Sequence, residues 1–180
     1  MKKKIIIGVV AVVLILAAAI SYLNYRNYSL SPRGNAELTT GDLSVSVKYS
    51  RPSVRNRVIF GTQEQGALQP YGVYWRLGAN EATEITFSKD VTINGNPLKA
   101  GAYRFYAIPG SSEFEIIANT ELGIWGVFEP DPALDVMKTR IPVERISSVE
   151  QFTIGLTPSD GGINIVIEWS DVRLVVPVKG

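Results

Sequence analysis

Residues 151–178 have the sequence QFTIGLTPSDGGINIVIEWSDVRLVVPV, in which apolar and polar side chains alternate. Two turn-forming groups, Asp160-Gly161-Gly162 and Ser170-Asp171, divide this stretch into three runs. The apolar positions are Phe152, Ile154, Leu156, Ile163, Ile165, Ile167, Trp169, Val172, Leu174, Val176 and Val178. A period of two buries one face of a strand and leaves the other in water, as in antiparallel sheets. The stretch therefore predicts three antiparallel strands joined by two turns.

The same period recurs over most of the chain after residue 42, for example in residues 43–49 and 84–88. Asn94-Gly95 between two short apolar segments is typical of a tight β-hairpin. A weak helix signal at residues 131–137 passes into alternation, and it predicts a turn that leads into a strand. We expect an all-β fold, an antiparallel β-sandwich or, alternatively, a flattened β-barrel. The aromatic residues expected in its core are Phe60, Trp75, Phe87, Phe105, Phe114, Trp125, Phe152 and Trp169.

The N-terminus has the pattern of a membrane-directed segment. Lys2–Lys4 precede a run from Ile5 to Ile20 that has no polar side chain. As a helix, residues 5–23 would span about 28 Å, close to the roughly 30 Å of a bilayer's hydrocarbon core. This run is longer than the core of an ordinary signal peptide. We therefore favour an uncleaved signal-anchor, one transmembrane helix, over a leader cleaved near residues 17–19.

The charges around this span predict its orientation. Three lysines stand before it, which places the N-terminus in the cytoplasm and residues 24–180 outside it, in the cell envelope. Cleavage of the leader would instead release the rest as a secreted protein. Polar and turn-forming residues dominate between positions 24 and 41, as in a linker. We therefore divide the chain into an anchor (1–23), a tether (24–41) and a β-domain (42–180).

The composition excludes several classes of function. The chain has 18 basic and 17 acidic residues, without the basic excess typical of nucleic-acid-binding proteins. It has no cysteine and no histidine, which excludes disulfides, thiol and Ser-His-Asp catalysis, and metal sites built on these residues. The aspartates near turns lack the spacing of a calcium-binding EF-hand loop. We expect no metal and no cofactor.

The alternation breaks at residues 70–85, PYGVYWRLGANEATEI. A strand begins over residues 73–77, and Gly78-Ala79-Asn80 interrupts it. If the parity of Ile85 extends backwards, Glu81 points inward, and a buried carboxylate needs a cationic or hydrogen-bonding partner. Arg76 and Arg55 are the partners expected for Glu81.

Arginines gather in the same part of the chain. Arg51, Arg55 and Arg57 share one parity and are expected to form a basic stripe on one sheet face. Guanidinium groups hold carboxylates and phosphates through paired hydrogen bonds. One interpretation is a binding site for an anion or a sugar acid, and the other is an internal salt-bridge network that fixes the loop at 78–80. The residues of this candidate site are Arg55, Arg76, Asn80, Glu81 and Glu84.

At these residues the sequence resembles a bacterial envelope domain family of unknown function, found mainly in Bacteroidetes. The resemblance includes PSVRNRVIFG at 52–61 and the signature W-R-x-G-A-N-E-A-T-x-I-T-F at 75–87. It continues through the Asn94-Gly95 hairpin and the segments AGAY, IPG and WG, to residue 178. The resemblance implies an envelope β-domain, and it assigns neither a reaction nor catalytic residues.

Three functions are compatible with these patterns. We favour non-enzymatic binding of a small anion, a saccharide or an envelope partner, with the membrane contacted through residues 5–23. A structural or assembly domain with an internal Arg–Glu network is the first alternative. A glycosidase or lyase that uses Glu81 and Glu84 is the second, although side chains three positions apart on a strand face opposite sides.

Overall fold

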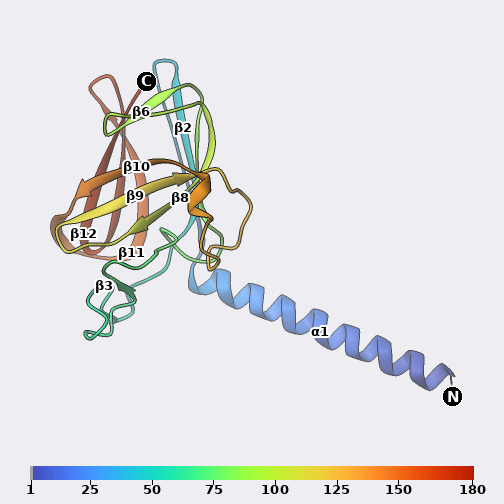
Figure 1. Cartoon of the computed structure of the whole chain (residues 1–180). Helices are drawn as coiled ribbons and strands as arrows, with labels where there is room; N and C mark the ends of the chain where they lie inside the picture. The colour runs from blue at the N-terminus through green and yellow to red at the C-terminus, as the bar shows by residue number, and fades with distance from the viewer. Residues whose placement is uncertain (1) are drawn as a thin grey trace.

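The computed structural model describes residues 2–180, as one long helix attached to a β-rich body (Figure 1). Helix α1 (Lys2–Leu30) leads into a six-stranded sheet with the order β1-β2-β5-β8-β9-β10. A four-stranded sheet has the order β11-β12-β6-β7, and β3 pairs with β4 in a small parallel ribbon. The strands are β1 (Arg33–Thr40), β2 (Leu43–Ser50), β3 (Phe60–Gly61), β4 (Gln69–Pro70), β5 (Thr83–Phe87), β6 (Val91–Ile93), β7 (Asn96–Leu98), β8 (Gly101–Ile108), β9 (Glu113–Asn119), β10 (Asp135–Pro142), β11 (Glu144–Ser159) and β12 (Gly162–Lys179).

Every pairing within the two large sheets is antiparallel, as the period of two predicts. The alternating residues of β2 and β5 are buried on one face, among them Val45, Val47 and Ile85. Over the described residues the sheets remain separate and do not close on themselves. The predicted antiparallel β-sandwich is confirmed, and the alternative of a flattened barrel is wrong.

The predicted turns are confirmed at Asn94-Gly95 and Asp160-Gly161, whereas the turn expected at Ser170-Asp171 is wrong. Strand β12 continues through this point, with Ser170 at a φ of 54° and a register shift opposite it on β11. The buried positions of β12 change from odd to even residue numbers at this point, and β11 has four positions for every two of β12 on either side of the Val149–Ser170 pair, so the pairing of the two strands is bulged here. Strand β11 begins at Glu144, opposite Arg173, and the last residues of β12, Val178 and Lys179, pair with β6.

An aromatic cluster fills the space between the two sheets. The rings of Trp75 and Trp169 stack with their centroids 5.9 Å apart, and Phe60 and Phe152 contact the edge or face of both. Trp125, also expected in the core, is only partly buried, because it lies in the irregular segment between β9 and β10. The core therefore depends on residues from both sheets and from the segment that precedes β5.

The structure differs from the predicted tether at residues 24–41. Helix α1 continues to Leu30, and β1 pairs with β2 along its whole length. Strand β1 lies at the edge of its sheet, with Glu37 and Thr39 exposed, so its polar composition resembles that of a linker. The β-body therefore begins at residue 33, and only Ser31 and Pro32 separate it from the helix.

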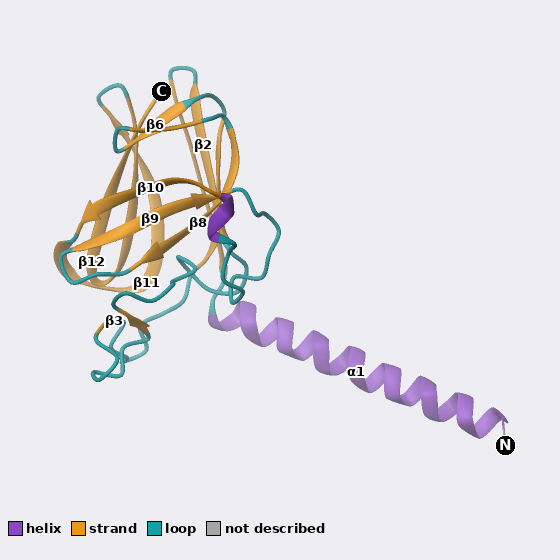
Figure 2. Cartoon of the chain, in the orientation of Figure 1, coloured by secondary structure: helices purple, strands orange, loops and turns teal. Residues whose placement is uncertain are grey.

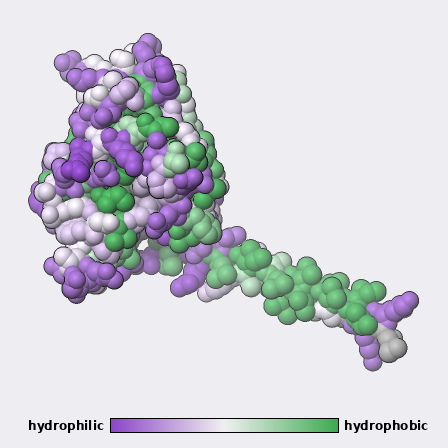
Figure 3. Space-filling model, in the orientation of Figure 1, coloured by the Kyte–Doolittle hydropathy of each residue, from purple (hydrophilic) through white to green (hydrophobic). Residues whose placement is uncertain are grey.

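Helix α1 has no buried residue and presents a continuous apolar surface (Figure 3). Its length and composition allow it to serve as a membrane anchor or as a signal sequence. The longest irregular segments of the body gather at the end from which α1 leaves (Figure 2).

Candidate functional site

Residues 75–84 form the junction between the helix and the sandwich. The strand expected over residues 73–77 is reduced to a single bridge, in which Trp75 exchanges two backbone hydrogen bonds with Ala107. Leu77 and Asn80 have φ values of 56° and 57°, and these left-handed conformations turn the chain out of the sheet. The hydroxyl of Thr83 donates to the carbonyl of Leu77 at 2.6 Å, which fixes this turn where β5 begins.

Two glycines allow neighbouring segments to approach this turn closely. A Cβ atom on Gly78, whose φ is +147°, would lie 2.9 Å from the carbonyl oxygen of Ser50. A Cβ atom on Gly126 would lie 2.8 Å from Cδ of Arg76 and 2.9 Å from the carbonyl oxygen of Asn80. Any larger side chain at either position would have to displace backbone or the stem of Arg76. The Gly126 amide instead donates to the Asn80 carbonyl at 2.9 Å.

The turn also holds the end of α1, in a set of contacts that we call the helix clasp. Glu81 Oε1 accepts hydrogen bonds from the Tyr28 hydroxyl and, at 2.9 Å, from the Arg33 guanidinium. The Asn80 amide donates to the Ser31 carbonyl at 3.1 Å, and Arg55 donates to the Leu30 carbonyl at 2.8 Å. The last carbonyls of a helix have no partner within the helix, so these donors satisfy them. The clasp fixes the direction in which α1 leaves the body.

The expected partners of Glu81 were wrong. Arg33, not Arg76 or Arg55, pairs with Glu81, whose side chain is 39% exposed. Burial favours a raised pKa for Glu81, but the hydrogen bonds from Tyr28 and Arg33 outweigh it and hold the pKa below its usual value. Glu81 therefore stays ionised at neutral pH and serves the clasp.

A cavity of about 280 Å³ lies beside the clasp, at the end of α1. Its polar lining consists mainly of hydrogen-bond donors, and no carboxylate among residues 2–180 lines it. We call it the cationic pocket. The residues that define it are Arg55, Arg57, Gln69, Arg76, Asn80 and Trp169.

Two of its arginines are held by backbone carbonyls. Arg57 donates to the carbonyls of Val54 and Ser53 at 3.0 and 2.6 Å, and Arg55 donates to Leu30. Arg55 has a φ of 50° and lies in a turn, so the predicted basic stripe on one sheet face is wrong. Arg51 turns away and donates instead to the carbonyl of Phe152 and the hydroxyl of Thr153.

Arg76 differs from both, because its guanidinium makes no hydrogen bond and no ion pair to any residue in the described range 2–180. Its side chain is partly buried, and burial lowers its pKa, with repulsion from nearby Arg104 acting in the same direction. An arginine nevertheless remains protonated at neutral pH. Trp169 is fully buried in the pocket wall, and its indole N–H also has no acceptor in the structure. The pocket is thus lined by Arg76, a cation without a protein partner among residues 2–180, and by Trp169, whose buried indole N–H also lacks an acceptor there.

The two glutamates of the candidate site lie elsewhere. Glu81 and Glu84 line a second cavity of about 300 Å³, between the start of β1 and the segment at Gly123. There the Glu84 carboxylate accepts a hydrogen bond from the Gly123 amide at 2.9 Å. The structure therefore brings together three of the five predicted residues, Arg55, Arg76 and Asn80, and separates the two acids from them.

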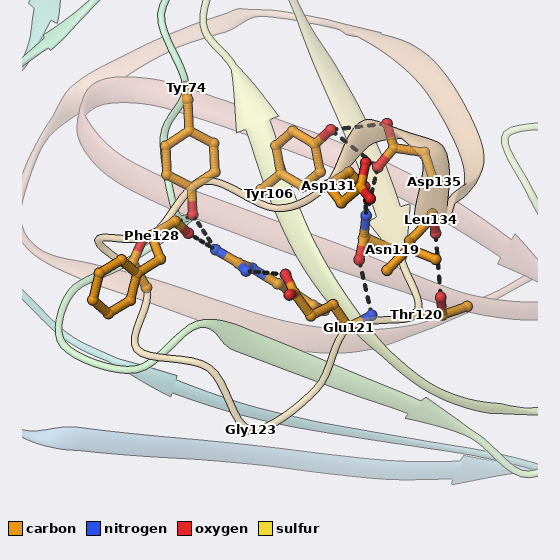
Figure 4. A network of polar contacts seen from close by, with 12 residues as sticks. Tyr74, Tyr106, Asn119, Thr120, Glu121, Gly123, Phe128, Asp131, Leu134 and Asp135 are labelled. Carbon is orange, nitrogen blue, oxygen red and sulfur yellow. Dashed lines mark hydrogen bonds and ion pairs between the residues drawn. The ribbon is translucent and has the colours of Figure 1, made fainter.

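No sequence pattern predicts the buried polar network that Figure 4 shows between β8, β9 and the segment that follows β9. At its centre, the Arg104 side chain is fully buried and donates to Glu121, to the Tyr74 hydroxyl and to the Phe128 carbonyl. The Tyr74 hydroxyl donates in turn to the Gly126 carbonyl at 2.8 Å. These contacts fix the segment between β9 and β10 against the body.

A second part of this network surrounds Asp135, whose carboxylate is 3% exposed. It accepts hydrogen bonds from Tyr106 at 3.0 and 3.1 Å and from Asn119 at 2.9 Å, and it pairs with Lys138. Burial, together with the hydrogen bond to Asp135, raises the pKa of Tyr106.

The raised pKa of Tyr106 predicts a loss of stability at alkaline pH. Above pH of about 10 the unfolded tyrosine ionises while the folded one stays protonated, so the free energy of unfolding falls as pH rises. Tyr106 alone can contribute up to about 1.4 kcal/mol per pH unit to this fall in the free energy of unfolding, and we expect Tyr106→Phe to abolish that contribution. Denaturant unfolding of the full chain in detergent between pH 8 and 11 measures it. If the free energy of unfolding falls equally steeply with pH in the wild type and in the variant, the raised pKa of Tyr106 is contradicted.

The fold and the pocket together define the chain as a β-sandwich domain that carries an N-terminal apolar helix and a cationic cavity at their junction. Residues 31–178 match a family described as "Protein of unknown function (DUF2911)", and the chain belongs to this family. The matched region begins directly after α1 and covers nearly the whole β-body. No curated protein and no solved structure matches the chain. Membership in an uncharacterised domain family is confirmed, and the envelope location stays a prediction.

Proposed function

We propose that the chain is a membrane-anchored, extracytoplasmic domain that binds a small anionic molecule in the cationic pocket. The observation that carries the proposal is Arg76, a partly buried guanidinium without an anionic partner in the structure. A charge in such a position costs free energy unless it is paired. A carboxylate or phosphate between Arg76, Arg55 and Arg57 would supply the missing partner.

The remaining lining restricts the class of ligand. Asn80 and Gln69 place amide groups beside the arginines, and such groups can bind the hydroxyls of a sugar. The pocket volume of about 280 Å³ is slightly below the roughly 300–1,000 Å³ typical of ligand sites, so it suits only a small molecule. These features favour a sugar acid or a sugar phosphate over a long polymer.

The orientation of the chain supports an extracytoplasmic site. Lys2–Lys4 precede the apolar span, and an excess of positive charge favours the cytoplasmic side. The pocket is lined by Leu30 and Ser31, at the other end of α1. In this orientation the pocket faces the envelope, close to the membrane surface.

The two alternative functions have less support. Glu81 and Glu84 share a cavity, but each already accepts hydrogen bonds from the protein. The lowered pKa of Glu81 also makes it a poor general acid at neutral pH. A purely structural Arg–Glu network does not account for Arg76, which pairs with no acid among residues 2–180.

The proposal is tested by thermal unfolding of the full chain in detergent against sugar acids, sugar phosphates and inorganic phosphate. A ligand at 100 times its dissociation constant stabilises the folded state by about 2.7 kcal/mol. We expect Arg76→Gln to keep the fold and to weaken binding by about 10- to 100-fold, because a charged hydrogen bond is lost.

Arg140→Gln is the matched control, because it removes the same charge from an arginine that is 70% exposed on β10. We expect this variant to bind as the wild type does. The proposal fails if no compound shifts the unfolding of the wild type. It also fails if Arg76→Gln and Arg140→Gln bind a stabilising ligand equally well.

A further inference from the structure

The segment between β9 and β10 exposes four large apolar side chains, of which Leu134, at 41%, lies in the 3-10 turn directly before β10 and the other three lie between residues 122 and 128. Leu122, Val127 and Phe128 are 42%, 54% and 63% exposed. We call them the apolar loop. Outside α1, Phe128 has the largest exposed fraction among the large hydrophobic residues of the described chain. Exposed apolar side chains clustered on one element of a soluble surface usually mark a contact with another molecule.

The apolar loop is fixed in shape by the body beneath it. The Arg104 guanidinium binds the Phe128 carbonyl, and the Phe128 ring points away from that guanidinium (Figure 4). The Tyr74 hydroxyl holds the Gly126 carbonyl at 2.8 Å from the same side. The exposed side chains are therefore presented outward by a buried network, and their exposure does not result from a lack of backbone contacts.

The apolar loop lies next to the exit of α1. Trp125 forms a β-bridge with Glu81, which accepts the hydrogen bond from Tyr28 of the helix. Gly126 donates to Asn80, which in turn donates to the Ser31 carbonyl. Apolar surface is visible on the side of the body next to the helix (Figure 3).

If α1 spans a bilayer, its length places this junction at the outer edge of the lipid headgroups. Its 29 residues span about 43 Å, whereas the hydrocarbon core needs about 20 residues and 30 Å. If residues 5–23 occupy the hydrocarbon, residues 24–30 rise about 10 Å above it, just beyond the roughly 5–8 Å of headgroups on each side of a bilayer. The helix clasp and the two-residue link at Ser31-Pro32 keep the body at that height.

We propose that Leu122, Val127 and Phe128 insert into the lipid interface beside α1, so that the bilayer surface is a second binding partner of the β-body. This inference rests on the anchoring of α1 that the proposed function includes. Interfacial insertion of aromatic and aliphatic side chains is driven by the burial of their apolar surface.

The absence of native cysteine makes a direct test possible in the full chain. Single nitroxide labels are placed at Val127→Cys and, separately, Phe128→Cys, in nanodiscs of zwitterionic and anionic phospholipid. Their accessibility to oxygen, which concentrates in lipid, is compared with that to a water-soluble nickel complex. Thr39→Cys is the aqueous control, because it lies near the end of β1 that is remote from α1, and Val12→Cys is the lipid control.

We expect the labels at 127 and 128 to be more accessible to oxygen than to nickel, as at position 12, and the ratio to reverse at position 39. If the labels at 127 and 128 are more accessible to nickel than to oxygen, as at position 39, while the label at position 12 is in lipid, the inference is overturned. The membrane anchoring of α1 would still be supported. Protection from both reagents would indicate contact with protein and would also overturn it. An aqueous label at position 12 would remove the anchor and the inference together.

Discussion

Replacing Trp75 with alanine is expected to lower the free energy of unfolding by about 3–5 kcal/mol. Trp75 is 2% exposed and stacks on Trp169, and the rings of Phe60 and Phe152 pack around both. Truncation would leave a cavity in the aromatic cluster that joins the two sheets. Such a cavity collapses poorly, because the surrounding rings belong to different strands and segments.

Denaturant unfolding of the full chain in detergent measures this loss. Trp125→Ala is the matched control, since the same side chain is removed from a partly buried position outside the cluster. We expect the control to lose clearly less stability. An equal loss in the two variants would show that the cluster around Trp75 does not dominate the core.

Arg104→Met is expected to lower the free energy of unfolding by about 3 kcal/mol. The substitution keeps most of the volume of the stem but removes every donor of the guanidinium. The Phe128 carbonyl and the Tyr74 hydroxyl would then lose a buried partner, while Glu121, which is 32% exposed, would regain water. The segment between β9 and β10 would also lose its main attachment to the body.

Denaturant unfolding tests the expected loss of stability in Arg104→Met, and limited proteolysis tests whether the segment at residues 120–131 is loosened. Arg140→Met is the control, because the pair between Arg140 and Glu113 is exposed and such pairs contribute about 0–1 kcal/mol. Faster cleavage of the segment in Arg104→Met alone is the expected result. Stability and cleavage equal to those of the control would contradict the role given to Arg104.

The sandwich could be predicted from the sequence because a period of two is a local property of each strand. The error at Ser170 has a physical reason: a turn and a β-bulge both shift the parity of the apolar positions by one residue. Residues 33–40 were predicted to be a linker because an edge strand with one solvent-exposed face has a similarly polar composition. In both cases the ambiguity is resolved by the partner strand, which local patterns do not identify.

The sequence could predict the part of the candidate site whose residues come from two neighbouring loops. Arg55, Arg76 and Asn80 meet because the segments that follow β2 and precede β5 lie side by side at one end of the body. The partners of Glu81 and the presence of Trp169 in the pocket depend on contacts between residues far apart in the chain. Arg104 was missed because a buried arginine within a strand has no local signal.

The helix clasp has a mechanical consequence. Leu30 and Ser31 are both hydrogen-bonded to the body and both line the pocket, so the junction between α1 and the body is held on the side of the cavity. A change in the tilt of α1 relative to the body would therefore displace Leu30 and Ser31, which form part of the cavity wall. If α1 spans a bilayer, the thickness of that bilayer, which contributes to helix tilt, would then influence the shape of the cavity that a ligand would fill.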